Sequence, residues 1–112
     1  MVSSCIFCKI IAKQIPSTII TENDQVIVIK DIYPKAPIHY LIIPKKHIVD
    51  IAAFEAGDAD LAASMLMMAK ELTIMLDGSK AFKLLVNNGA DAGQMVFHSH
   101  MHFLAGKKMA DF

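Results

Sequence analysis

The stretch that decides the fold runs Met95-Val96-Phe97-His98-Ser99-His100-Met101-His102-Phe103-Leu104. It places three of the five histidines at alternate positions within an apolar run. Because side chains alternate between the two faces of a strand, this spacing predicts a strand over Val96–Leu104 with its three imidazoles on one face. Buried ring nitrogens need hydrogen-bond partners, so three rings in a row indicate a chemical site rather than ordinary packing.

Composition limits the classes of protein to consider. The length of 112 residues predicts a single domain spanning 1–112. Hydrophobic residues make up 54% of the chain, and the mean hydropathy of +0.44 predicts that some apolar surface covers a subunit interface. Eleven basic and eleven acidic residues give a net charge of zero, which argues against nucleic-acid binding through phosphate neutralisation. No apolar stretch is long enough for a membrane span and residues 1–4 resemble no signal peptide, so we expect a cytoplasmic protein without membrane contacts.

Working outward from the histidine strand, apolar periodicity and turn residues predict six further elements. These are a short helix over Ile6–Ala12, strands over Thr18–Glu22, Gln25–Ile32 and His39–Pro44, a long helix over Asp58–Leu76, and a strand over Ala81–Val86. The expected fold class is α+β, a mostly antiparallel five-stranded sheet with the long helix covering one face. Core packing is the main interpretation of the apolar stripe on the long helix, which comprises Leu61, Met65, Met68, Leu72 and Met75.

A glycine-containing loop, Asn87–Gln94, leads into the histidine strand. Gly89 and Gly93 could free backbone amides to point at an anion, as phosphate-binding loops do. The alternative is an ordinary turn between two strands. Beside three histidines, the loop suits a site that holds a phosphate next to an imidazole.

The two cysteines, Cys5 and Cys8, form a Cys-x-x-Cys pair. A metal half-site is a better interpretation than a disulfide or a thioredoxin-like redox pair, because no strand precedes them and no secretory signal is evident. Two more ligands must then come from elsewhere. His47 and His98 are candidates, although the residues alone do not select them from the other histidines.

The three imidazoles themselves allow more than one chemistry. A neutral histidine is a competent nucleophile toward phosphorus when one ring nitrogen is free and the other is held as a donor. His100, flanked on both sides, fits that role best. The main rival is a zinc or copper site built from alternating histidines, and a purely structural row of histidines is a third reading.

The stretch His98–Leu104 resembles the histidine-triad signature, in which three histidines alternate with apolar residues. Further segments are similar to that family and follow in the family's order: Cys5–Ile11, Asp31–His39, Ile43–Ile48 and Asn87–Gln94. The nearest resemblance is to the Hint-like nucleotide-binding branch. Two positions depart from the pattern, since Ser99 replaces an apolar residue and Met95 stands where Hint-like proteins often carry a hydroxyl.

The resemblance implies a homodimer whose subunits join their sheets, each with a pocket for a purine nucleotide derived from AMP or GMP. The implied activity is hydrolysis of nucleoside phosphoramidates, of the adenosine 5′-monophosphoramidase type, through a nucleotidyl-histidine intermediate. Two alternatives remain at this point. One is hydrolysis of dinucleoside polyphosphates, and the other is a non-catalytic nucleotide-binding regulatory module.

The resemblance also assigns roles by position. His100 would be the nucleophile, with His102 on the phosphate and His39 behind it as a polarising partner. Besides His100 and His102, the implied nucleotide-binding residues are Asp31, Ile32, Asn87, Gly93, Gln94 and Met95. A structural zinc ion would be held by Cys5, Cys8, His47 and His98. Each of three residues also has an ordinary structural interpretation when it is taken alone. Asp31 could cap a turn, His39 could be a core histidine, and Asn87 could hold a left-handed turn conformation.

Overall fold

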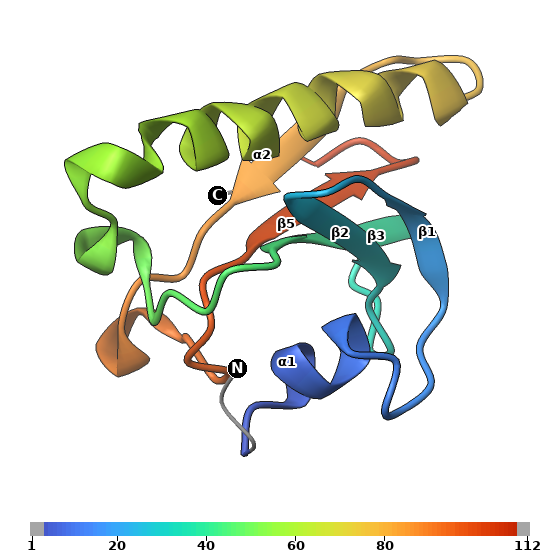
Figure 1. The fold of residues 1–112 in the computed structure, drawn as a ribbon. Coiled ribbons are helices and arrows are strands. Elements are labelled where there is room, and N and C mark those ends of the chain that lie inside the picture. The colour runs from blue at the N-terminus through green and yellow to red at the C-terminus, as the bar shows by residue number, and fades with distance from the viewer. Residues whose placement is uncertain (1–3, 110–112) are drawn as a thin grey trace.

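A five-stranded antiparallel sheet organises the residues that this computed structural model describes, 4–109 (Figure 1). Its strands are β1 (Ile19–Glu22), β2 (Val26–Lys30), β3 (Ile38–Pro44), β4 (Phe82–Leu85) and β5 (Met101–Ala105). They lie in the order β1-β2-β3-β5-β4, so β5 runs between β3 and the edge strand β4. The predicted α+β class and the antiparallel five-stranded sheet are confirmed.

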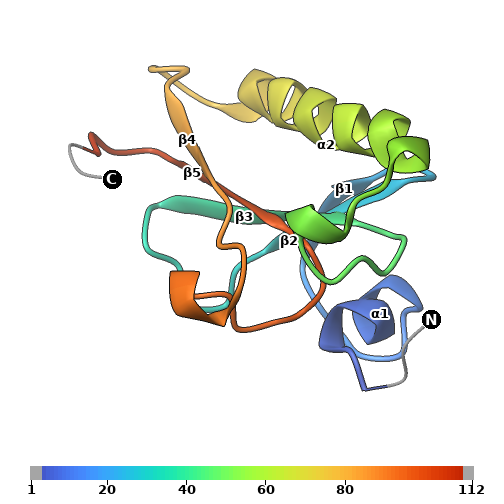
Figure 2. The same ribbon diagram turned by 90° about the vertical axis from the view of Figure 1, so that its left-hand side faces the viewer.

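Two helices lie on opposite sides of this sheet (Figure 2). The short helix α1 spans Ile6–Ile11 and the long helix α2 spans Ala59–Leu72. Short 3₁₀ turns occupy Ile51–Ala53, Ala56–Asp58, Thr73–Met75 and Ala90–Ala92. No helix among residues 4–109 is both long and apolar enough to cross a membrane.

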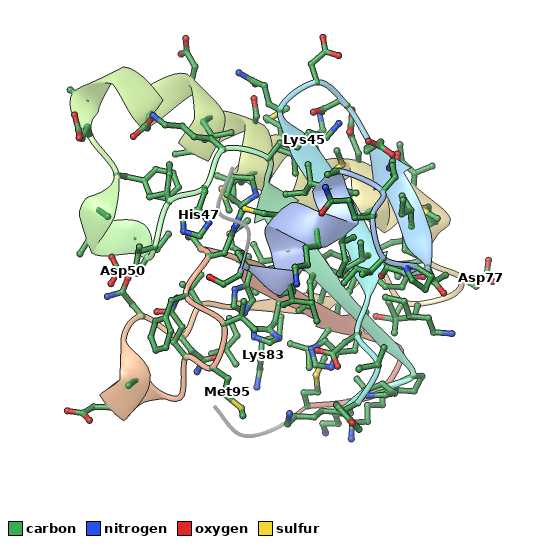
Figure 3. The ribbon with its side chains drawn as sticks, turned by 60° about the horizontal axis from the view of Figure 1, so that its bottom comes forward. Lys45, His47, Asp50, Asp77, Lys83 and Met95 are labelled. Atoms are coloured by element: carbon green, nitrogen blue, oxygen red, sulfur yellow. The ribbon has the colours of Figure 1, made fainter. Side chains whose placement is uncertain are left out.

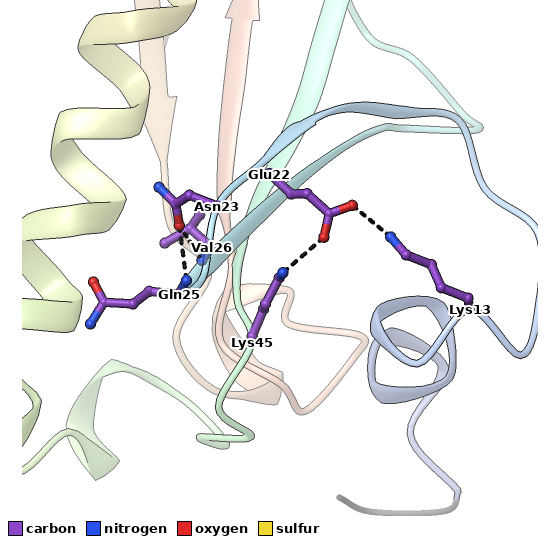
Figure 4. A network of polar contacts seen from close by, with 6 residues as sticks. All are labelled: Lys13, Glu22, Asn23, Gln25, Val26 and Lys45. Carbon is purple, nitrogen blue, oxygen red and sulfur yellow. Dashed lines mark hydrogen bonds and ion pairs between the residues drawn. The ribbon is translucent and has the colours of Figure 1, made fainter.

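The hairpin between β1 and β2 is closed by hydrogen bonds to a turn residue and is linked to neighbouring segments by ion pairs. Asn23 Oδ1 accepts a hydrogen bond from the Gln25 amide at 2.9 Å, as an Asx turn requires, and a second from the Val26 amide at 2.9 Å. Glu22 pairs with Lys13 beyond α1 at 2.6 Å and with Lys45 after β3 at 2.8 Å (Figure 4). These contacts fasten the edge of the sheet near the N-terminal segment.

The sheet is buried on both faces, whereas we expected cover on one face only. Residues on the α2 side form one cluster, which includes Val26, Val28, Ile42, Met65, Met68, Leu72 and Phe103. Residues on the α1 side form another, which comprises Cys5, Phe7, Cys8, Ile10, Ile27, Ile29, Leu41 and Ile43. The physical reason lies in β2, whose unbroken apolar run Val26–Ile29 has no polar face to offer solvent.

The histidine strand is shorter than predicted. β5 begins at Met101, and residues 96–100 are not in a strand. The strand begins there because its backbone pairing begins there. On the β4 side the last pair is Leu85 with His102, and on the β3 side it is Ile42 with Met101. His98 and His100 therefore reach their positions from a loop, and only His102 lies on the strand.

The long helix also ends earlier than predicted, at Leu72 rather than Leu76. The Thr73 hydroxyl donates to the Lys70 carbonyl at 2.6 Å, a local bond that competes with continued α-helix. The chain tightens into a 3₁₀ turn there, so Met75, expected in the core, is 54% exposed. The other four residues of the predicted stripe are buried: Leu61, Met65, Met68 and Leu72.

Candidate catalytic and metal site

The α1 side of the sheet holds two histidines on adjacent strands. His39 lies opposite Leu104 and His102 lies opposite Leu41, so the alternation of side chains places both imidazoles on the face that carries Leu41. His39 is 2% exposed, and the rings of His39 and His102 have centroids 5.1 Å apart. The strand register thus brings together two residues that lie far apart in the sequence.

The hydrogen bonds of His100 define its tautomer. Its Nδ1 lies 2.8 Å from the His98 carbonyl oxygen, which can only accept, so Nδ1 carries the proton. In the neutral ring, Nε2 is then left with a lone pair. Burial lowers the pKa of His100, and the side chain is 9% exposed, so the neutral form prevails near pH 7. An imidazole in this state is equipped to act as a nucleophile.

A chain of hydrogen bonds sets the tautomer of His102 in the opposite sense. The Lys35 amide donates to His39 Nδ1 at 3.0 Å, so the neutral His39 ring carries its proton on Nε2. That proton is donated to His102 Nδ1 at 2.9 Å, which leaves the His102 proton on Nε2. Burial lowers the pKa of His39; burial, reinforced by His100 and His39, lowers that of His102 to about 4. Beside a lone pair on His100, the site therefore offers an N–H donor on His102.

Asp31 lies at the same place, just after β2. One carboxylate oxygen accepts the Tyr33 amide at 2.7 Å, and the other lies 3.4 Å from His39 Nε2. Asp31, His39 and His102 are close enough together to bind a cation. The hydrogen bonds argue otherwise, because His39 accepts a hydrogen bond at Nδ1 and carries its proton on Nε2, so it has no free lone pair for a metal.

A second cluster on the same side has the donors a metal needs. Cys5 Sγ lies 3.4 Å and Cys8 Sγ 3.6 Å from His98 Nδ1, while Cys8 Sγ lies 3.3 Å from His47 Nδ1. The two Nδ1 atoms are 3.1 Å apart. His98 Nε2 donates to the Pro44 carbonyl at 2.7 Å, so its Nδ1 lone pair points into the cluster. In Figure 3, His47 lies beside α1, the helix that begins after Cys5 and contains Cys8.

These four side chains fit a tetrahedral metal ion. Zinc bound to two sulfurs and two nitrogens would hold its ligand atoms roughly 3.3–3.8 Å apart, close to the separations present. Cys5 and Cys8 are free thiols in the structure, and burial raises the pKa of Cys5. Two buried thiolates would therefore be costly without a cation between them. The cluster that includes His47 and His98 is close enough to hold a metal ion.

The glycine-containing loop is built around one buried side chain. Gln94 Oε1 accepts the Gly89 amide at 2.8 Å, and its Nε2 donates to the carbonyls of Val49 and Val96 at 2.7 and 3.0 Å. The Gly93 amide donates back into the loop as well, to the carbonyl of residue 90. The glycine amides proposed for an anion are thus occupied within the loop, and Gln94 holds its shape.

The remaining residues of the expected nucleotide site lie nearer the surface. The side-chain amide of Asn87 donates to the Ala92 carbonyl at 2.7 Å. Gly93 has a positive φ of 93°, which suits glycine, and a Cβ there would lie 3.4 Å from Asn87 Nδ2. Ile32 is 80% and Met95 is 89% exposed. Met95 projects outward from the loop in Figure 3. These side chains leave room for a ligand rather than completing a closed pocket.

Sequence reasoning missed the backbone atoms that orient the histidines. They are the Lys35 amide and the carbonyls of Pro44 and His98. It also missed Phe7, whose ring packs against both His98 and His100. No side-chain pattern could have identified the backbone groups, because every residue but proline carries the same two.

Comparison with known proteins gives a consistent result. The family model described as "Scavenger mRNA decapping enzyme C-term binding" matches residues 4–112. An uncharacterized HIT-like protein, slr1234 of Synechocystis, is 42% identical over 107 residues, covering 96% of this chain and 94% of the relative. Protein HitA of Neisseria gonorrhoeae is 39% identical over 101 residues, covering 90% and 94%.

Solved structures agree. A HIT family hydrolase from Clostridium thermocellum superposes with a TM-score of 0.93 at 41% identity, covering 100% of this chain and 98% of that one. A histidine triad protein from Clostridium difficile superposes with a TM-score of 0.91 at 35% identity, covering 100% and 98%. These matches show that this chain belongs to the histidine-triad (HIT) family.

Proposed function

We propose that this protein is a hydrolase of purine nucleoside phosphoramidates that works through a nucleotidyl adduct on His100. One observation carries the proposal: the Nδ1–H of His100 donates to the His98 carbonyl at 2.8 Å and leaves the Nε2 lone pair for attack. The name of the Clostridium thermocellum relative, a HIT family hydrolase, supports hydrolysis as the reaction class.

The reaction would have two steps. First, the His100 Nε2 lone pair bonds to the α-phosphorus while the P–N bond breaks, and the amine departs with the bonding electrons and takes a proton from water. Next, a water molecule attacks the same phosphorus and releases a proton to the solvent. The N–P bond breaks, its electrons return to Nε2, and the nucleoside monophosphate is released. The bond from Nδ1–H to the carbonyl stabilises the positive ring of the adduct.

The neighbouring groups suit the rest of a nucleotide. The Nε2–H of His102 would donate to a phosphoryl oxygen, with His39 fixing its direction. The Asp31 carboxylate would accept hydrogen bonds from the two ribose hydroxyls, and Ile32 would pack against the base. Beyond these residues, the loop residues Asn87, Gly93, Gln94 and Met95 would border the phosphate region.

We propose zinc as the ion for the cluster of Cys5, Cys8, His47 and His98, because two thiolates and two imidazoles are a ligand set that zinc prefers. When bound, zinc would stabilise the fold and leave no open coordination position for a substrate or water. The chemistry then stays with His100 and His102. Its thiolate ligands are best preserved in a reducing, cytoplasmic setting.

A second candidate substrate class is suggested by Met95. A thioether cannot donate a proton, so it gives no help to a departing amine. A polyphosphate leaving group needs less protonation than an amine, which favours dinucleoside polyphosphates as the alternative.

We also propose a homodimer that joins β4 to β4. β4 lies at one edge of the sheet, and such edges are usually covered. Exposed apolar side chains lie on α2, on the turn that follows it and on β4: Leu66, Met67, Ile74, Met75 and Phe82. Light scattering tests this assembly, since Phe82→Lys should give a monomer where the wild-type protein gives a dimer.

Steady-state turnover tests the activity. Wild-type protein should release AMP from adenosine 5′-monophosphoramidate faster than from a diadenosine polyphosphate. His100→Ala should bind AMP and turn over neither. A preference for the polyphosphate would select the second candidate, and AMP binding without turnover of either compound would select the regulatory module.

A further inference from the structure

Phe7 lies on α1 between the two cysteines, and its ring is only 6% exposed. Its centroid is 5.8 Å from that of His98 at an interplanar angle of 76°, and 5.1 Å from that of His100 at 84°. Both contacts are T-shaped, an arrangement that aromatic rings favour. One side chain thus touches a histidine of the metal cluster and the proposed nucleophile.

His100 needs such support, because it precedes β5 and no ladder pairing holds its backbone. The bond from Nδ1 to the His98 carbonyl fixes one atom of the ring. A single hydrogen bond restrains the ring plane only in part, since the second side-chain torsion of histidine is a broad one. The remaining ring contacts are with His102, whose centroid is 5.2 Å away, and with Phe7.

The placement of Phe7 depends in turn on the cysteines. α1 has only six residues, too few for a helix to be stable by itself. Cys5 accepts the Cys8 amide at the start of the helix, and both thiols face the imidazoles of the cluster. An ion bound there would hold α1, and with it Phe7, against the loop of His98 and His100.

We infer that Phe7 is a positioning residue that sets the ring plane of His100 for attack and links the metal cluster to the nucleophile. The inference rests on the proposed function, because it takes His100 to be the attacking group. Phe7 touches the ring and acts through it. Its loss should slow the step in which His100 attacks while leaving ground-state binding intact.

The experiment compares Phe7→Leu with Ile10→Val, a control on the same helix and in the same apolar cluster. Single-turnover formation of the His100 adduct from adenosine 5′-monophosphoramidate should slow at least about tenfold in Phe7→Leu. The Kd for AMP and the bound metal per chain should stay at wild-type values. Ile10→Val should keep the wild-type rate. If Phe7→Leu does not fold, Phe7→Met provides an apolar side chain with more freedom to fill the same space.

A second readout needs no substrate. The ¹⁵N chemical shifts of the His100 ring should report a single Nδ1–H tautomer in the wild-type protein and a mixture in Phe7→Leu. If the wild-type protein turns over no nucleotidyl substrate, the proposed function fails, and these shifts alone decide the positioning role. A wild-type adduct rate in Phe7→Leu, a loss confined to AMP affinity, or an unchanged single tautomer would overturn the inference.

Discussion

The two faces of the sheet are held together by different means. On the α2 face, buried side chains such as Met68 and Phe103 meet one another through apolar contacts, and their positions depend on volume. On the α1 face, imidazoles such as His39 and His100 are held by backbone amides and carbonyls, and their state depends on where each proton lies. The difference shows that one sheet can carry a core that depends on side-chain volume on one face and a chemical site that depends on proton positions on the other.

The largest effect should come from the α1 face. His100→Ala removes the nucleophile, so turnover should fall on the order of 10⁴-fold or more. Thermal unfolding should stay near the wild-type temperature, since the change leaves the α2 core untouched. Initial rates at saturating substrate, with AMP binding as the control for folding, check this. If His100→Ala kept a tenth of the wild-type turnover, His100 would not be the nucleophile.

Removal of the proposed metal ion should affect the α1 face and spare the α2 face. Cys8→Ser leaves an incomplete ligand set, and a chelator leaves the four ligands without an ion, so either should lower the free energy of unfolding by several kcal/mol. Amide hydrogen exchange should rise first in α1 and in the loop of His98, while amides in the middle of α2 stay protected. Metal analysis confirms the loss of the ion. Equal exchange increases on both faces would contradict a local role for the cluster.

A substitution in the α2 core should lower the stability of the protein and leave its turnover unchanged. Met68 lies on the buried side of α2 and is 2% exposed, and Met68→Ala should reduce the free energy of unfolding by about 2–5 kcal/mol. Turnover per folded molecule should not change, because no contact of Met68 reaches the histidines. Denaturant unfolding and an assay at low temperature measure the two quantities. A large fall in turnover per folded molecule would show that packing on the α2 face affects the site on the α1 face.

The pH dependence should also reflect the α1 face. Burial lowers the pKa of His39, and lowers that of His102 to about 4, below the ordinary value near 6.5. Between these pH values the unfolded chain takes up protons that the folded chain does not, so stability should fall as the pH drops from 6.5 toward 4. Urea unfolding across this range checks the slope. His102→Gln should show a shallower slope, and an equal slope in both proteins would refute the assignment.

The smallest effect concerns Ser99, whose buried hydroxyl has no partner among the described residues. The side chain is 2% exposed, and an unpaired buried hydroxyl is destabilising. Ser99→Ala should therefore stabilise the protein by about 1 kcal/mol. Denaturant unfolding measures the gain, with turnover unchanged. A loss of stability would mean that the hydroxyl makes a contact in solution.

Much of the α2 face could be predicted from the sequence, because it follows periodicity. The spacing of Leu61, Met65 and Met68 indicated the helix and its buried side. The end of that helix could not be predicted, since it turns on a local bond from Thr73 to a backbone carbonyl. The start of β5 at Met101 was missed for a related reason: a strand needs a partner, and pairing is a property of the tertiary structure.

The residues of the metal cluster could be grouped from the sequence, whereas the geometry of the histidines could not. Family resemblance grouped Cys5, Cys8, His47 and His98, and the structure brings these four together. It could not supply the tautomers, which depend on backbone carbonyls and amides that have no signature in a sequence. Nor did it mark Phe7, which reads as an ordinary core residue until its two ring contacts are known.

The central claim is that the Nε2 lone pair of His100 attacks phosphorus. Its most direct test is mass spectrometry of the intact protein, quenched during turnover of an adenosine phosphoramidate, followed by mapping of the modified residue. The account predicts an added adenylyl group on His100. Continued turnover with no adduct, or an adduct on His98 or His102 instead, would contradict it.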